Sequence, residues 1–274
     1  MNLGKISLAA SVKSSARPRA PKLFRVVALV AFVLLYLPLV TLVLTSFLAP
    51  VAGPGSSLGF SLEWYRKVFE NEAILGALWQ SVWVGAWATA IATVLGTAAA
   101  FAIERFRFPG RRVLEVVTHL PLIMPEIVLG LALLIWFVML RLTLGTLSIV
   151  LAHVTFSVSY VILTVRSRLE GFDEMLEEAA RDLGASARQA FWRVTFPLIL
   201  PGIASGAVMA FTLSFDDFLI TFFTAGVGSD TLPLKIYAMI KFGVSPEIQA
   251  LSTLMIAVTF LAVVVSARTS ALRK

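Results

Sequence analysis

Six long apolar stretches constrain the fold of this chain more than any other feature of its sequence. They cover residues 26–48, 78–103, 113–140, 147–165, 198–223 and 250–267. A helix of roughly 18 residues or more, rising about 1.5 Å per residue, is long enough to cross a hydrocarbon core of about 30 Å. Charged residues make up only 14% of the chain, too few to cover a water-soluble domain of this length. The sequence therefore predicts an all-α integral membrane protein with six transmembrane helices.

The positions of the basic residues predict the orientation of the chain. If both termini are cytoplasmic, 18 of the 23 Lys and Arg residues fall on cytoplasmic segments. Membrane proteins carry such an excess on the cytoplasmic side, so we expect both termini inside the cell. The net charge of +7 then reflects topology, and no nucleic acid partner is indicated. Residues 1–24 are predicted to form a disordered, basic cytoplasmic tail facing membrane lipid, and residues 25–274 the six-helix domain.

Several kinds of chemistry are excluded by what the sequence lacks. It has no cysteine, so disulfides, thiolate metal sites and cysteine nucleophiles are ruled out. Its two histidines, His119 and His153, lie inside apolar stretches, where a buried, hydrogen-bonded histidine is expected more often than a metal ligand. No phosphate-binding loop of the form GxxxxGKS or GxxxxGKT is present. We therefore predict no catalytic residue, no metal site and no cofactor in this chain.

The loop between the fourth and fifth apolar stretches, residues 166–197, predicts two short helices joined by a sharp turn. Apolar residues recur with helical spacing up to position 183, and Gly184 suits the position that ends a helix. Ser186 and Gln189 form a capping box that begins a second helix over residues 187–194. The first helix either lies flat at the membrane surface or docks into a groove of a partner protein. Its acidic side chains favour docking, because they suit anionic lipid poorly.

The same loop contains Glu178, Ala179 and Ala180, then Gly184, and further along Val194, Phe196 and Pro197. This pattern resembles the "EAA" loop of binding-protein-dependent ABC importer permeases, except that the family has Ile and Leu at positions 194 and 196. The resemblance implies that the first helix of the loop couples the chain to separate ATPase subunits, which bind ATP and Mg²⁺. Glu178, Ala179, Ala180 and Gly184 would then carry the coupling, with small side chains allowing close approach and glycine allowing the turn.

Three carboxylates lie within the apolar stretches: Glu126, Asp216 and Asp217. A charge at bilayer depth costs at least about 2.5–3.5 kcal/mol, so each needs a partner or a cavity. Two interpretations stay open: the acids are hydrogen-bonded between helices, or they attract a cationic substrate. Adjacent helical residues point about 100° apart, so Asp216 and Asp217 are expected to have different roles. Further candidates for the substrate pathway are Ser214, on the face of Asp217, and the rings of Phe215, Phe218, Tyr237 and Trp136.

A more specific resemblance concerns the substrate. Residues 157–163, 168–173, 210–217 and 232–251 are similar to the second permease of spermidine/putrescine importers, and the similarity extends over most of the chain from Glu63 onward. It implies a polyamine substrate, location in the inner membrane, a second permease subunit and an external substrate-binding protein. An ABC permease for another small solute and an ion-coupled secondary transporter remain as alternatives. A secondary transporter has no need of the loop at residues 166–197.

Gly202 and Gly206 form a GxxxG pattern in the fifth apolar stretch. Such small residues favour close contact between membrane helices. The pattern serves either packing within this chain or packing against a second permease subunit, and the sequence weighs the two equally.

Overall fold

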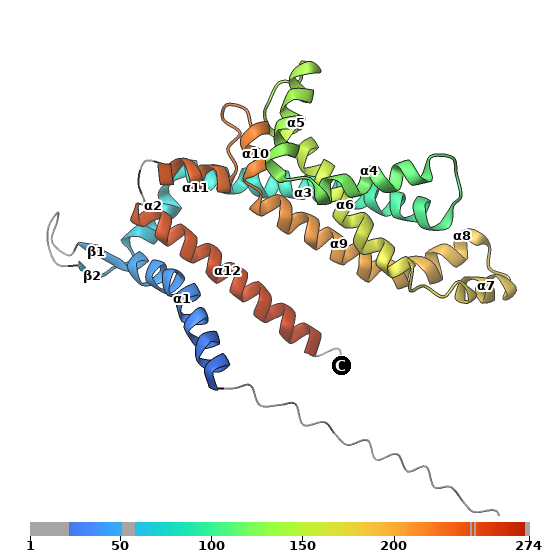
Figure 1. Cartoon of the computed structure of the whole chain (residues 1–274), viewed down its shortest axis with the longest axis horizontal. Coiled ribbons are helices and arrows are strands. Elements are labelled where there is room, and N and C mark those ends of the chain that lie inside the picture. The colour runs from blue at the N-terminus through green and yellow to red at the C-terminus, as the bar shows by residue number, and fades with distance from the viewer. Residues whose placement is uncertain (1–21, 51–57, 242, 244, 272–274) are drawn as a thin grey trace, which may run out of the picture.

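The computed structural model describes residues 22–50, 58–241, 243 and 245–271 (Figure 1). Most of these residues are helical. Of the tail expected over residues 1–24, residues 1–21 lie outside the described part of the chain, and residues 22–24 already belong to the first helix. The helices, with one π-helical turn labelled η1, are α1 (Lys22–Ser46), α2 (Glu63–Glu70), α3 (Glu72–Arg105), α4 (Arg111–Ile123), α5 (Glu126–Met139), α6 (Thr146–Leu169), α7 (Met175–Asp182), α8 (Ala187–Ala190), η1 (Phe191–Thr195), α9 (Phe196–Asp216), α10 (Leu219–Thr224), α11 (Leu232–Lys241) and α12 (Pro246–Ala271).

The centre of the molecule is formed by α3, α6 and α9, which pack along one another (Figure 1). Glycines allow this close packing. A Cβ atom on Gly96 of α3 would lie 2.7 Å from the side chain of Val161 on α6. Gly202 and Gly206 of α9 also face α6, because Cβ atoms there would meet Arg168 and Val161. The GxxxG pattern therefore serves packing within the chain.

Several of the expected elements are confirmed. Helices α1, α3 and α6 cover the first, second and fourth apolar stretches. Helix α3 begins earlier than expected, because the Asn71 side chain accepts hydrogen bonds from the amides of Ala73 and Ile74 and caps it. By length and apolar composition, four helices in the described chain can cross a bilayer, or five if one bent pair counts as a single span. Helix α12 adds a shorter apolar segment, Pro246–Phe260.

The third apolar stretch, residues 113–140, was expected to be one transmembrane helix, and the structure divides it into two. Helices α4 and α5 meet at a bend of 116°. Met124 is extended, with φ −71° and ψ 137°, because the ring of the following Pro125 disfavours the helical conformation of the residue before it. As a result α4 packs along α6, whereas α5 turns away and packs chiefly on α10 (Figure 1).

The fifth apolar stretch is also broken, although it was expected to be continuous over residues 198–223. Helix α9 ends at Asp216, and Asp217 is extended with φ −65° and ψ 127°. The carboxylate of Asp217 accepts hydrogen bonds from the amides of Ile220, at 3.2 Å, and Thr221, at 2.8 Å. An aspartate that satisfies the free amides of the next helix in this way competes with continuation of the first.

At the other end of the described chain, α1 lies against α12, and α2 packs on α12. A short antiparallel pair of strands, β1 (Leu48–Pro50) and β2 (Leu58–Phe60), joins α1 to α2. The hydroxyls of Ser46 and Tyr65 lie 2.6 Å apart, and the indole of Trp64 donates to the carbonyl of Leu48 at 2.8 Å. Helix α2 thus contacts both the segment that follows α1 and the start of α12.

The two short helices expected in residues 166–197 are present as α7 and α8. Gly184 has φ +92°, and two hydrogen bonds close the end of α7: the Gly184 amide donates to Arg181, and the Ala185 amide donates to Ala180. This is the Schellman arrangement that favours glycine. Ser186 and Gln189 cap α8 reciprocally, as predicted. The second helix does not stop at residue 194, because it continues through η1 into α9.

We predict that Gly96→Ala destabilises the protein, whereas Gly76→Ala on the same helix does not. The added methyl group at position 96 would lie 2.7 Å from Val161, and such overpacking costs about 1–3 kcal/mol. At position 76 nothing lies within 4 Å, and alanine gains up to about 1 kcal/mol of helix propensity. Thermal unfolding in detergent compares the two variants. Equal stability of both would contradict the close contact between α3 and α6.

Candidate functional site

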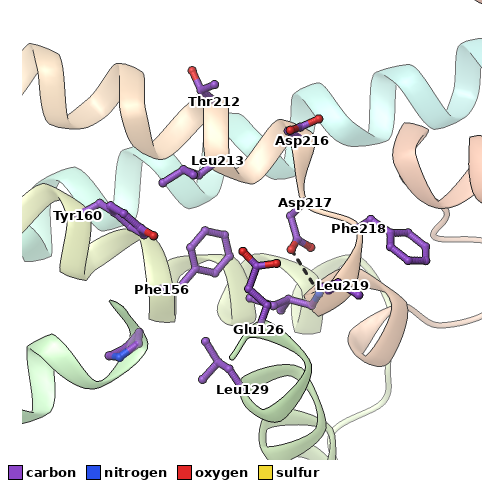
Figure 2. A pocket seen from close by; sticks show the side chains of 12 residues that line it. Glu126, Leu129, Phe156, Tyr160, Thr212, Leu213, Asp216, Asp217, Phe218 and Leu219 are labelled. Carbon is purple, nitrogen blue, oxygen red and sulfur yellow. Dashed lines mark hydrogen bonds between the residues drawn. The ribbon is translucent and has the colours of Figure 1, made fainter. Parts of the chain in front are cut away.

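A cavity of about 270 Å³ lies where the breaks in the third and fifth apolar stretches face each other (Figure 2). We call it the carboxylate cavity, because all three carboxylates predicted from the sequence line it: Glu126, Asp216 and Asp217. Glu126 begins α5, directly after the proline break, and the two aspartates lie where α9 ends. Ring faces from α6 complete one wall, those of Phe156 and Tyr160. Irregular backbone at membrane depth is tolerated where it lines such a cavity.

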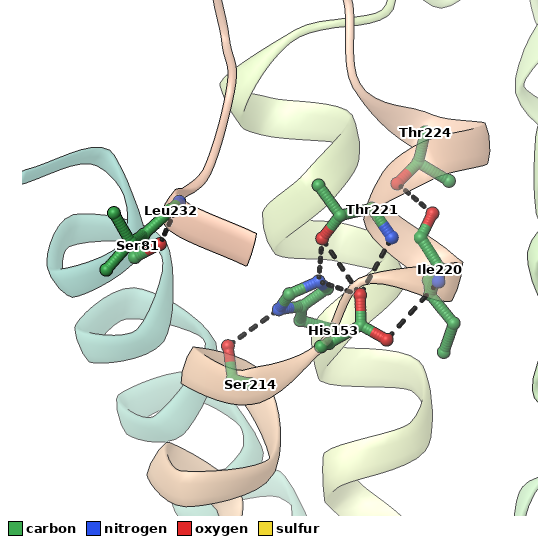
Figure 3. Close-up of polar contacts among 8 residues, drawn as sticks. Ser81, His153, Ser214, Ile220, Thr221, Thr224 and Leu232 are labelled. Carbon is green, nitrogen blue, oxygen red and sulfur yellow. Dashed lines mark hydrogen bonds and ion pairs between the residues drawn. The ribbon is translucent and has the colours of Figure 1, made fainter. Parts of the chain in front are cut away.

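Asp217 is held in a network of hydrogen bonds around a buried histidine (Figure 3). His153 of α6 has no solvent exposure, and its Nε2 lies 3.2 Å from Asp217 Oδ2 and 2.9 Å from Thr221 Oγ1. Its Nδ1 lies 2.6 Å from the hydroxyl of Ser214. Thr221 also donates its hydroxyl to Asp217, at 2.9 Å. The prediction of a buried, hydrogen-bonded His153 is confirmed. Ser214 and Asp217 both contact this histidine, but they do not share a helix face as expected, because α9 ends before Asp217.

The other two carboxylates of the cavity are in a different state. Glu126 and Asp216 are exposed, and neither has a salt-bridge partner among the described residues. Asp216 and Asp217 are neighbours in the chain, yet one is free and the other is fixed to a neighbouring helix. This agrees with the expectation that their roles differ.

The aromatic candidates are only partly brought to the cavity. Phe218 lines it, and the ring of Tyr237 on α11 contacts that of Phe218 in a tilted arrangement, with centroids 4.6 Å apart and an interplanar angle of 40°. Tyr237 therefore supports the cavity wall from behind. Phe215 lies in an apolar cluster with Val68 and Leu232, and Trp136 is on the exposed part of α5. Neither of these last two residues lines the carboxylate cavity.

A second candidate surface is the outward face of α7. Glu178 and Ala179 are exposed, and Ala180 is half-buried. Apolar side chains flank them, with Leu183 exposed to 90% and Met175 to 71%. Apolar side chains so exposed on a short helix at one end of the molecule mark an interaction surface rather than a core. The structure thus brings together the loop residues singled out from the sequence.

The opposite face of α7 carries a contact that the sequence analysis missed. Glu177 receives a hydrogen bond of 2.8 Å from Arg105 at the end of α3, and one of 2.9 Å from the buried Thr195 in η1. Burial alone raises the pKa of Glu177, but the bonds from Arg105 and Thr195 outweigh it and hold that pKa below the ordinary value of 4.5. Glu177 therefore stays ionised at neutral pH. Its ion pair with Arg105 is lost only as the pH falls through the depressed pKa of Glu177.

Comparison with known proteins agrees with this architecture. Residues 92–273 match the family described as the binding-protein-dependent transport system inner membrane component. The chain belongs to this family. The permease is 39% identical over 237 residues to the spermidine/putrescine transport system permease protein PotC of Haemophilus influenzae, over 86% of this chain and 92% of that protein. It is also 39% identical over 243 residues to the putrescine transport system permease protein PotI of Escherichia coli, over 84% of each chain.

The permease also shares its fold with a solved importer. It superposes on a chain of a bacterial ABC transporter involved in the import of the acidic polysaccharide alginate, with a TM-score of 0.70 over 92% of this chain and 95% of that chain. The two are 16% identical, so the likeness concerns the fold alone. Family and fold together make this chain a permease subunit of an ABC importer of the bacterial inner membrane.

The contrast between the two aspartates yields a stability prediction for the permease. Asp217→Ala is expected to lower the free energy of unfolding by about 2–4 kcal/mol, because it removes both the partner of a buried histidine and the cap of α10. Asp216→Ala is expected to change it by no more than about 0.5 kcal/mol, because Asp216 is exposed and unpaired. Denaturation in detergent micelles measures both. A larger loss for Asp216→Ala than for Asp217→Ala would refute the network around His153.

Proposed function

We propose that this permease translocates polyamines such as spermidine and putrescine across the inner membrane, driven by ATP hydrolysis in separate ATPase subunits. The observation that carries the proposal is the carboxylate cavity, where Glu126 and Asp216 form no salt bridge with any residue that the structure describes and Asp217 adds a third negative group. The substrates in the names of the relatives PotC and PotI support the same class.

The chemistry of the cavity suits a substrate with more than one ammonium group. A carboxylate at bilayer depth without a partner costs at least about 2.5–3.5 kcal/mol. Each ammonium that reaches Glu126 or Asp216 offsets part of this cost for as long as it stays. Because these two side chains are exposed, the cation is not enclosed by protein on every side and can leave. The rings of Phe156, Tyr160 and Phe218 offer additional cation–π contact.

The topology that we infer has six spans, with the bent pair α4–α5 counted as one and α12 as the last. The excess of Lys and Arg supports cytoplasmic termini. With that orientation, the cytoplasmic side contains α7, α8, the end of α3 at Arg105 and the end of α6 at Arg166. In this arrangement α7 is the coupling helix, with Glu178, Ala179, Ala180 and Gly184 against the ATPase, which binds ATP and Mg²⁺. A second permease subunit completes the pathway, and a periplasmic binding protein delivers the substrate.

The proposed substrate is tested by neutralising the unpaired carboxylates. The double variant Glu126→Gln and Asp216→Asn, assembled with its partner subunits and binding protein in vesicles, is expected to take up spermidine at least about tenfold more slowly, because it loses charge-assisted contacts. The expected stability is unchanged, since neither side chain has a salt-bridge partner among the described residues. Glu72→Gln at the exposed start of α3 is the matched control. Normal spermidine uptake by the double variant would refute the proposal.

The proposed coupling role is tested at the glycine turn. Gly184→Asp is expected to leave the protein inserted but to abolish ATP-driven uptake, because a side chain at φ +92° strains the turn and the new charge faces the ATPase. Gly110→Asp is the control, since Gly110 has a similar φ of +90° and equally open surroundings but lies between α3 and α4. Uptake and ATP hydrolysis are measured together. Equal uptake in the two variants would contradict a coupling role for α7.

A further inference from the structure

A second cavity, of about 150 Å³, lies between α4 and α6, nearer to α7 than the first. We call it the inner cavity, because the proposed orientation puts it on the cytoplasmic side. Its polar lining comes from two helices. Helix α4 contributes Thr118 and His119, and the second half of α6 with the residue after it contributes Ser159, Arg166 and Glu170. None of these is used by the carboxylate cavity.

The two cavities follow the same face of α6. Phe156 and Tyr160 line the carboxylate cavity, and Ser159, Leu163 and Glu170 line the inner cavity. These positions are separated by three, four and seven residues, the spacing that puts side chains on one face of a helix. From residue 156 to residue 170 the helix rises about 21 Å. A solute that moves along this face passes one cavity and then the other.

The side chains contributed by α4 offer hydrogen-bond acceptors to the inner cavity. Nδ1 of His119 lies 2.5 Å from the carbonyl oxygen of Glu115. A carbonyl can only accept, so Nδ1 carries the proton, and Nε2 is the ring nitrogen left to accept a hydrogen bond. The Thr118 hydroxyl donates to the same carbonyl at 3.0 Å, which leaves its own lone pairs free.

Ser159 adds a hydroxyl to the wall of the inner cavity. Ser159 is only 3% exposed, and it lines the inner cavity. In the part of the chain that the structure describes, its hydroxyl makes no hydrogen bond to another protein group. The hydroxyl oxygen is not one of the fully buried side-chain atoms that lack a partner, so the cavity reaches it and a donor that enters can bond to it.

The charges around the inner cavity favour a cation over an anion. Arg166 is surrounded by carboxylates, with Glu104 at 3.2 Å, Glu115 at 3.7 Å and Glu170 at 3.9 Å. One further guanidinium joins the group, that of Arg111 at 3.6 Å from Glu115. Only Arg166 and Glu170 of these charged residues line the cavity itself. Glu104 and Glu115 lie nearer to Arg166 than Glu170 does, so the carboxylate of Glu170 is the one left to accept from an ammonium.

We propose that the inner cavity is a second binding station for an ammonium group of the transported cation, reached after the carboxylate cavity and before release to the cytoplasm. The ammonium donates to Nε2 of His119 and to the hydroxyl of Ser159, near the carboxylate of Glu170. This inference rests on the proposed function, because it takes the transported solute to be a polyamine.

The station is tested in the complete transporter, reconstituted in vesicles with its binding protein and supplied with spermidine. His119→Leu and Ser159→Ala are each expected to lower the maximal rate of uptake roughly tenfold, the factor for one hydrogen bond to a charged group. The half-saturating concentration stays unchanged, because capture occurs on the opposite side. His119→Gln keeps an acceptor near the place of Nε2 and is expected to restore most of the rate.

Two controls make the result decisive. Ser205→Ala removes an exposed hydroxyl that bonds the Pro201 carbonyl of its own helix, and its uptake is expected to be normal. Spermidine binding to the detergent-solubilised complex without the binding protein is expected to fall by one site in His119→Leu. Wild-type uptake and wild-type binding stoichiometry in both His119→Leu and Ser159→Ala would overturn the station.

The same measurements separate this inference from the proposed function. If Glu126→Gln with Asp216→Asn loses uptake while His119→Leu and Ser159→Ala transport normally, only the inner station is wrong. If the double variant transports spermidine normally, the proposed function itself fails.

Discussion

The pairing of His153 with Asp217 is the interaction on which the site depends. A carboxylate among apolar helices needs a partner or water, and Asp217 has its partner inside the protein. The imidazole is fully buried and reaches Ser214, Thr221 and Asp217 from a different helix. Because Asp217 also caps α10, the same interaction ends one helix, begins another and fixes the angle between them. The carboxylate cavity exists because α9 does not continue.

The two breaks in the apolar stretches form one wall together. Pro125 turns α5 away from α4, and α5 then packs on α10, the helix that Asp217 starts. The packing is close: a Cβ atom on Gly130 would lie 2.8 Å from the ring of Phe223 and 3.3 Å from Cα of Ile220. Each break frees backbone groups that lipid cannot satisfy, so breaks of this kind are stable only beside each other or beside a cavity. This explains why the unpaired acids Glu126 and Asp216 gather at the same place.

Features set by neighbouring residues were predictable from the sequence, and features set by distant ones were not. The Gly184 turn and the Ser186 cap follow from a few adjacent residues, and both are confirmed. Hydropathy fixed the positions of α1, α3 and α6 but could not detect the breaks, because Pro125 and Asp217 interrupt stretches that remain apolar on average. His153 and Asp217 are far apart in sequence, so their contact required the packing of α6 against α9. The inner cavity was missed for the same reason.

Helix α3 gives α7 a direct mechanical connection to the opposite end of the molecule. At one end of α3, Arg105 donates a hydrogen bond to Glu177 of α7. Ser81 lies 24 residues before Arg105, which is about 36 Å along α3. The hydroxyl of Ser81 accepts a hydrogen bond of 2.8 Å from the amide of Leu232 at the start of α11. The ring of Tyr237 on α11 in turn packs against that of Phe218 in the cavity wall. These contacts form a continuous chain from α7 through α3 and α11 to the wall of the carboxylate cavity. Because α7 also joins α9 through the bond of Glu177 to Thr195 in η1, the short helix is connected to two elements that border the cavity.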